Sequence, residues 1–226
     1  MRSKLFVPGV RPELFAKALA GDADALSFDL EDSVPEARKS EARQQVSEFV
    51  QSAAVPAAAK LIVVRVNALD TQHLQADLAA VARTGVDLVN LPKVESARDV
   101  LAAVAILEQA EISNGVSQPI RLLANIETPR GLRLAAEIAA AHPRVAGLQL
   151  GLADLFEPFG IDRRDPANVH ATLYAMRMAA AEAGVFAWDA AFADLEDAEG
   201  FRAEADMARR LGYVGKSCIH PRQVAL

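Results

Sequence analysis

The chain has 226 residues, of which 52% are hydrophobic and 24% are charged. This composition is typical of a soluble globular protein with one sizeable core, and it excludes a disordered chain. The formal net charge is −6, and no basic stripe interleaved with aromatic residues occurs, so we expect no nucleic-acid partner.

The sequence gives two indications of cellular location. Its one cysteine, Cys218, excludes an intrachain disulfide and suits a reducing compartment. No stretch approaches the ~18 uninterrupted apolar residues of a transmembrane helix. The first apolar run is ended by Pro8 and Gly9, which makes it too short for a secretory signal. We therefore expect a cytoplasmic protein without membrane contact, with Cys218 as a buried, inert thiol.

Two patterns alternate along the chain. Short apolar runs predict eight strands, at 4–7, 25–30, 61–66, 86–91, 121–126, 145–150, 185–188 and 213–219. Segments rich in Ala, Glu and Arg with helical periodicity predict seven helices, at 12–20, 36–51, 71–84, 96–113, 128–141, 166–183 and 197–211. Strict alternation of strand and helix implies a parallel sheet.

Local signals mark the ends of several predicted helices. Ser96, with Asp99 three residues later, resembles a capping box. Pro129 falls at an early helical position, where its missing N–H costs nothing. Gly184 and Gly212 follow helical segments, as left-handed terminators often do.

These elements favour a (β/α)₈ TIM barrel formed as a single domain over residues 1–226. An open doubly wound sheet is the alternative, but its GxGxxG fingerprint is absent, because the first turn reads PGVRPE. The sequence reads IHPRQVAL soon after the eighth predicted strand, so we expect a barrel without the eighth helix and C-terminal tail. We expect apolar outer surface near the first and eighth strands, to be covered by a partner chain or such a tail.

Carboxylates follow several of the apolar runs. Glu127 and Asp154 end the fifth and sixth runs, which are neighbours in a barrel whose active site lies at the carboxyl ends of its strands. Two carboxylates suffice for Mg²⁺, which keeps waters or substrate oxygens as its other ligands. The alternative is that each residue caps a helix. We favour the metal because both residues lie at successive strand ends.

Further charged residues end the second, third and fourth runs. Glu31 and Asp32 close the second, in DLED, where alternation prevents all the acids from facing one site. We expect some of them to contribute to the site and others to pair with Lys39, Arg38 or Arg43. Arg65 ends the third run, where it binds a substrate carboxylate or oxyanion, pairs with Glu31 or Asp32, or does both. Lys93 ends the fourth run and is expected to form an ion pair rather than a Schiff base.

Several motifs together resemble one known family. RSKLFVPG, ALSFDLEDSV, VVRVN, LPKVE, IETPRGL, LGLADL and GYVGKSCIHPRQV occur in the order found in the CitE-like group of the HpcH/HpaI aldolase–citrate lyase β superfamily. The resemblance extends from Arg2 to Val224. It implies a Mg²⁺-dependent TIM barrel that makes or breaks a carbon–carbon bond in citryl-, malyl- or methylmalyl-CoA, or condenses an acyl-CoA with a 2-oxo acid.

The resemblance also implies roles for individual residues. Glu127 and Asp154 would hold Mg²⁺, and Arg65 would contact the oxo acid. Glu31 and Asp32 would hold metal-bound water, and Phe6 and Pro8 would contact CoA. Relatives form homo-oligomers, trimers or hexamers, and continue past the IHP motif into a tail that can close over a neighbour's active site. Some of them supply a catalytic carboxylate from that tail.

The proton acceptor and the substrate class stay open at this point. Asp189, after the seventh run, is a candidate base, and a helix or turn cap is its equal alternative. One alternative function is a CoA-independent aldolase acting on free 2-oxo acid adducts. Another is a subunit of a lyase complex served by an acyl carrier protein, or a weakly catalytic relative.

Overall fold

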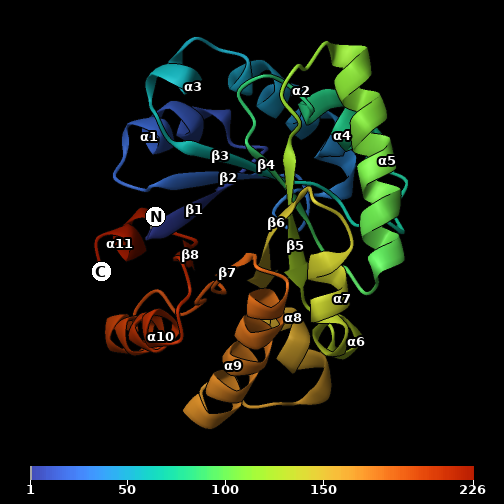
Figure 1. The fold of residues 1–226 in the computed structure, drawn as a ribbon. Coiled ribbons are helices and arrows are strands. Elements are labelled where there is room, and N and C mark those ends of the chain that lie inside the picture. Colours follow the sequence, from blue (N-terminus) through green and yellow to red (C-terminus); the bar gives the residue numbers. More distant parts are fainter. Residues whose placement is uncertain (1) are drawn as a thin grey trace.

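Eight parallel strands form a barrel at the centre of the molecule, described here from a computed structural model over residues 2–226. Helices surround the strands (Figure 1). The strands follow the order β7-β6-β5-β4-β3-β2-β1-β8. Their bounds are Ser3–Pro8 (β1), Ala25–Asp29 (β2), Leu61–Arg65 (β3), Leu88–Leu91 (β4), Arg121–Ile126 (β5), Val145–Leu150 (β6), Phe186–Trp188 (β7) and Lys216–Cys218 (β8).

The barrel closes between β7 and β8. Asp189, directly after β7, forms a parallel bridge with Lys216. The backbone N–H of Asp189 donates to the carbonyl of Gly215 at 2.9 Å, and the N–H of Ser217 donates to the carbonyl of Asp189 at 3.2 Å. These bonds join the two edges of the sheet, so the predicted (β/α)₈ barrel is confirmed and the open doubly wound sheet is wrong.

Each predicted helix is present. The α-helices are Phe15–Ala20 (α1), Lys39–Val50 (α2), Ala54–Ala57 (α3), Leu74–Val81 (α4), Ala97–Asn114 (α5), Pro129–Arg133 (α6), Ala135–Ala140 (α7), Leu152–Phe156 (α8), Pro166–Glu182 (α9), Ala198–Arg210 (α10) and Pro221–Val224 (α11). Short 3₁₀ turns occupy Pro12–Leu14, Glu36–Arg38 and Glu157–Phe159. The single helix predicted at 128–141 is broken at Leu134, whose φ of −102° and ψ of 12° leave the helical range. The unpredicted helices α3, α8 and α11 have four or five residues, too few for a periodic signal.

The predicted helix ends match the structure. The Oγ of Ser96 accepts the backbone N–H of Asp99, and Pro129 occupies the first turn of α6. Gly184 and Gly212 have φ of 69° and 83°, in the left-handed region that a residue without Cβ adopts freely. These caps mark the first turns of α5 and α6 and the ends of α9 and α10.

The interior of the barrel changes in polarity along its axis. Near the amino ends of the strands, Val63 and Leu88 pack with Leu61 and Phe186 in an apolar layer. Arg65 and Asn90 follow Val63 and Leu88 by two residues and therefore share their face. A much larger apolar cluster lies between the outer faces of the strands and the helices. The inside of the barrel is thus polar where the strands end, which is where a site forms.

A groove of about 710 Å³ runs along the outside of the barrel next to β8. Residues of α10, β8 and α11 line it, together with Arg2. The helix that follows β8 within the described residues is α11, which has four residues. Both marked ends of the chain lie near α11 in Figure 1. Among the helices of residues 2–226, none is long and apolar enough to cross a membrane.

Candidate active site

A cavity of about 450 Å³ opens at the carboxyl ends of the strands. Its walls come from the ends of β1, β2, β3, β5 and β6 and from the start of α8. Five of the residues that the sequence singled out line it, namely Phe6, Pro8, Asp32, Arg65 and Asp154. Active sites of this barrel type lie at this end. We therefore place the candidate site here rather than in the larger outer groove beside β8.

Arg65 lies at the centre of a group of acids. Its Nε and Nη2 donate to the two carboxylate oxygens of Asp29 at 2.7 and 2.8 Å. Its Nη1 donates to Asp32 at 3.0 Å and lies 3.0 Å from an oxygen of Glu31. The expected ion pairs of Arg65 with Glu31 and Asp32 are confirmed, and Arg65 also lines the cavity. Its expected binding of a substrate carboxylate or oxyanion stays a prediction.

The sequence pattern did not single out Asp29, although this residue holds Arg65 most firmly. Asp29 also accepts the backbone N–H groups of Glu31 at 3.0 Å and Ser33 at 3.1 Å. Burial alone would raise the pKa of Asp29, but the charge and hydrogen bonds of Arg65 hold that pKa below its ordinary value. Asp29 is thus a permanent anion that shapes the turn after β2 and orients the guanidinium.

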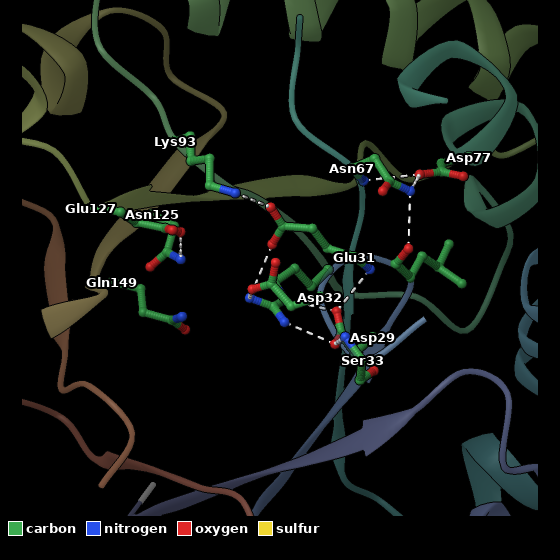
Figure 2. Close-up of polar contacts among 12 residues, drawn as sticks. Asp29, Glu31, Asp32, Ser33, Asn67, Asp77, Lys93, Asn125, Glu127 and Gln149 are labelled. Carbon is green, nitrogen blue, oxygen red and sulfur yellow. Dashed lines mark hydrogen bonds and ion pairs between the residues drawn. The ribbon is translucent and has the colours of Figure 1, made fainter. Parts of the chain in front are cut away.

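Glu31 links Arg65 to Lys93. Figure 2 shows Lys93 reaching the Glu31 carboxylate, and the Nζ–Oε1 distance is 3.0 Å. The predicted ion pair of Lys93 is confirmed. Burial lowers the pKa of Lys93, but the hydrogen bond and charge of Glu31 outweigh this effect and raise it above its ordinary value. A protonated Lys93 of this kind is a poor Schiff-base nucleophile.

The expected pairing of Glu31 or Asp32 with the basic residues of α2 is wrong. Lys39 donates to the backbone carbonyls of Leu30 and Glu31 and to the side chain of Asn67. The two arginines of this segment form ion pairs with other acids, Arg38 with Glu41 and Arg43 with Asp77. The acids of the DLED motif therefore pair with Arg65, at the end of β3, and Glu31 also pairs with Lys93, which follows β4.

Glu127 and Asp154 meet across the ends of β5 and β6. Burial first, then the negative charges of Glu31 and Asp154, raise the pKa of Glu127 to about 8. Gly151 permits this approach, since a Cβ at that position would lie 2.8 Å from the Cγ of Glu127. Helix capping, the alternative role, is wrong for both residues, because Thr128 caps α6 and Gly151 is the N-cap of α8.

This pair fits a divalent cation that takes oxygen ligands. One carboxylate oxygen of Glu127 accepts from the Asn125 amide, while the other, Oε2, is buried without a hydrogen-bond partner among the described residues. A cation would satisfy this oxygen and remove the repulsion that raises the Glu127 pKa. No group of three or more His, Cys, Asp or Glu side chains arranged for a metal occurs within residues 2–226. Two carboxylates match the usual protein ligands of Mg²⁺ better than the Cys- and His-rich ligand sets of Zn²⁺.

Asp189 lies outside this cavity. Its carboxylate is fully buried and accepts from the Nζ of Lys216 at 2.7 Å and from the backbone N–H of Ala190. Lys216 also donates to Glu204 of α10, on the outer side of the barrel wall. The structure therefore does not bring Asp189 together with Arg65 and Glu127, and its expected capping of a helix is not seen either.

Lys4 and Gln149 are site neighbours that the sequence did not point out. Gln149 lines the cavity, and its Oε1 accepts from the Nζ of Lys4, a fully buried lysine inside the barrel. Figure 2 shows Gln149 beside Asn125 and Glu127. The signal available in the sequence was a lysine within an apolar strand, two residues before Phe6.

Comparisons with family models, with curated proteins and with solved structures all point to one family. The HpcH/HpaI aldolase/citrate lyase family matches residues 2–221. The L-malyl-CoA/beta-methylmalyl-CoA lyase of Cereibacter sphaeroides is 35% identical, over 100% of this chain and 77% of the relative. The citrate lyase subunit beta of Escherichia coli K12 is 38% identical, over 100% of this chain and 74% of the relative. Protein CitE of Mycobacterium tuberculosis, solved with magnesium, acetoacetate and coenzyme A, aligns with a TM-score of 0.80 and 35% identity over 99% of this chain and 78% of that one.

Proposed function

Because the chain belongs to the HpcH/HpaI aldolase/citrate lyase family, it is a carbon–carbon lyase, and we propose that it cleaves a hydroxyacyl-CoA thioester into an acyl-CoA and a 2-oxo acid, or catalyses the reverse condensation. The acyl group is of the citryl, malyl or methylmalyl type. The observation that carries this proposal is the juxtaposition, at one end of the barrel, of the Glu127–Asp154 pair with Arg65.

Mg²⁺ is the proposed cofactor, held by Glu127 and Asp154. When bound, it would supply Lewis-acid polarisation of the substrate carbonyl. The unpartnered Oε2 of Glu127 and its raised pKa support this assignment. Asn125 donates to the other oxygen of Glu127 and so orients the carboxylate. The relative from M. tuberculosis was solved with magnesium, which also supports it.

Arg65 and the acids around it prepare the site for an oxo acid. Asp29 holds the guanidinium by two bonds, and Asp32 and Glu31 lie beside Nη1, so the orientation of the group is set before substrate arrives. We assign to Arg65 the binding of the 2-oxo acid and stabilisation of negative charge on its oxygen as the carbon–carbon bond breaks or forms. Glu31 and Asp32, both beside Nη1 of Arg65, would hold water in the coordination shell of the cation.

Phe6 and Pro8 form the wall of the cavity contributed by β1. Alternation along the strand places both on the interior face. We propose that they contact the CoA thioester, whose acyl end must reach the Glu127–Asp154 pair. The complex of the M. tuberculosis relative with coenzyme A supports a thioester substrate.

The test is a thioester assay on the purified chain. Malyl-CoA and citryl-CoA are supplied separately, and acetyl-CoA or propionyl-CoA is supplied with glyoxylate, each with Mg²⁺ and with EDTA. We expect Mg²⁺-dependent turnover that Glu127→Gln abolishes. Glu111→Gln is the matched control, because Glu111 is also a buried, hydrogen-bonded glutamate but lies on α5 and pairs with Arg144. Turnover of a free hydroxy-oxo acid that CoA neither accelerates nor inhibits would contradict the proposal.

The relatives named citrate lyase subunit beta favour a second candidate, in which the chain acts as one subunit of a lyase complex. In that case the isolated chain binds Mg²⁺ but turns over CoA thioesters poorly, and acyl groups on a carrier protein are the better substrate. Comparing the two forms of the same acyl group separates the candidates. The homo-oligomer expected from the sequence stays a prediction, which light scattering of the purified chain tests.

A further inference from the structure

Lys4 is a lysine inside the barrel without an anionic partner. It pairs with Ala25 of β2 and Ser217 of β8, and its side chain is 0% exposed. Within residues 2–226, no carboxylate lies within ion-pair distance of its Nζ. Burial and, next, the charge of Arg65 lower the pKa of Lys4 well below its ordinary value. A buried amine without a carboxylate is costly, so its retention calls for a reason.

The contacts of Lys4 all lead to the wall of the cavity. Its Nζ donates to the Oε1 of Gln149 and lies 4.8 Å from the ring centre of Phe6. Both of these residues line the cavity. The Nζ also lies 5.5 Å from the ring centre of Trp188, so two aromatic faces help to accommodate the charge. Lys4 thus lies directly behind the surface that substrate meets.

The contact with Lys4 fixes the orientation of the Gln149 amide. In the structure the Nζ of Lys4 donates to the Oε1 of Gln149, so the NH₂ group of the same amide faces the other way. The NH₂ group makes no hydrogen bond to the described residues and is not enclosed by them. Since Gln149 lines the cavity, its two donors are available to a ligand there.

The distribution of charge indicates which ligand group these donors take. Asp29, Glu31 and Asp32 gather on the β2 and β3 side, and Figure 2 shows Gln149 away from them, beside Asn125 and Glu127. These acids repel an anionic group of the substrate except at Arg65, whereas Gln149 offers it two hydrogen-bond donors on the other side of the cavity. A carboxylate oxygen is an acceptor that suits a pair of amide donors.

We propose that Lys4 is a positioning residue, which holds Gln149 so that its NH₂ group donates to a carboxylate oxygen of the 2-oxo acid. This inference rests on the proposed function for the identity of the ligand. Without Lys4 the Gln149 amide can adopt a second orientation, in which its NH₂ group donates to another acceptor. The Oδ1 of Asn125, the register partner of Gln149, is a buried acceptor without a partner among residues 2–226, and the freed amide can turn towards it.

The test is a double-mutant cycle with Lys4→Met and Gln149→Ala, read out as binding of pyruvate in the presence of Mg²⁺ by calorimetry. We expect Lys4→Met alone to weaken binding roughly 10-fold, since a hydrogen bond to a charged acceptor is lost. In the Gln149→Ala background, Lys4→Met should have no further effect. Equal effects of Lys4→Met in both backgrounds, or no effect in either, would overturn the proposal.

Two further measurements separate positioning from a general structural role. Lys4→Met should raise the melting temperature by about 2–4 °C, because an unpaired buried amine is removed. A fall in both melting temperature and affinity would make Lys4 merely structural and overturn the proposal. The ¹⁵N side-chain amide signal of Gln149 should shift in Lys4→Met without any ligand. If wild-type protein neither binds pyruvate nor turns over thioesters, the proposed function fails. An unshifted Gln149 signal in Lys4→Met would separately overturn the proposal that Lys4 orients the Gln149 amide.

Discussion

Asp29 and Arg65 are register partners on β2 and β3, and their side chains form two parallel hydrogen bonds of 2.7 and 2.8 Å across the two strands. Because neighbouring strands in a barrel hold their residues at a fixed spacing, this pair is determined by the backbone. The guanidinium is therefore set in place before substrate enters, and the cost of ordering its long side chain is met during folding.

Replacing Arg65 by lysine tests this arrangement. Lysine keeps the positive charge but lacks the planar fork that matches Asp29 and the substrate. We expect kcat/KM for the thioester substrate to fall roughly 100-fold, as for the loss of a donor to a developing oxyanion. Circular dichroism should show that the barrel is retained.

The matched control for Arg65→Lys is Arg144→Lys. Arg144 has nearly the same side-chain exposure, 14% against 13%, and pairs with buried Glu111 at 2.8 Å, but it precedes β6 at the opposite end of the barrel. This variant should lose some stability and keep its turnover. If both variants lose turnover to the same extent, Arg65 has no special role in the site.

The strands and several site residues could be predicted because their signals are local. Each strand is a short apolar run, and Glu127, Asp154 and Arg65 stand at the ends of such runs, where a barrel gathers its site. Phe6 and Pro8 were expected only from the resemblance to the CitE-like group, and no local signal marked them.

The missed residues depend on contacts between distant segments. Lys4 and Gln149 are 145 residues apart, and although a lysine within an apolar strand is unusual, neither strand alone shows that the two side chains meet. Asp29 belongs to a motif with three acids, and only the register between β2 and β3 shows that Asp29 is the one directly opposite Arg65. Asp189 ends a strand like the other candidates, but its side chain faces Lys216 and α10, because faces alternate along a strand.

The raised pKa of Glu127 predicts how stability depends on pH when divalent cations are removed with EDTA. The folded protein keeps this proton up to about pH 8, whereas an unfolded chain releases it near the ordinary glutamate value. The folded state therefore binds more protons over that window, so its free energy of unfolding falls as pH rises, by up to about 1.4 kcal/mol per pH unit from this group. Thermal melts from pH 5 to 9 measure this fall.

Glu127→Gln should remove this component of the pH dependence, because an amide does not titrate. The variant should therefore be more stable than wild type at pH 8 in EDTA, and saturating Mg²⁺ should stabilise wild type alone. Parallel stability profiles for the two proteins across the window would show that Glu127 ionises normally.

Cys218 should be chemically silent in the folded protein. Its side chain is buried, and burial raises the pKa of its thiol to about 11, so almost no thiolate is present at neutral pH. We expect labelling by Ellman's reagent at pH 8 to proceed at the rate of unfolding and to accelerate with denaturant. Rapid labelling without denaturant, at a rate proportional to reagent concentration, would contradict this assignment.

Lys216 should contribute to stability rather than to chemistry. It donates to Asp189 at 2.7 Å and to Glu204 at 2.6 Å, and all three side chains are buried. Lys216→Met leaves two buried carboxylates without this cation, although Arg163 still pairs with Glu204. We expect a loss of about 3–5 kcal/mol in the free energy of unfolding, measured with urea. The exposed Lys17→Met is the control and should change it by less than about 0.5 kcal/mol.

Asp189→Asn separates the structural reading of this cluster from a catalytic one. The amide keeps the shape of the carboxylate and weakens its bond to Lys216, so stability should fall by less than in Lys216→Met. Turnover per folded molecule should stay within about twofold of wild type, because the cavity has no contribution from Asp189. A loss of turnover of roughly 100-fold or more in a fully folded Asp189→Asn protein would restore Asp189 as the base. That result would require the β7 end of the barrel to rearrange when substrate binds, since in this structure the carboxylate faces Lys216.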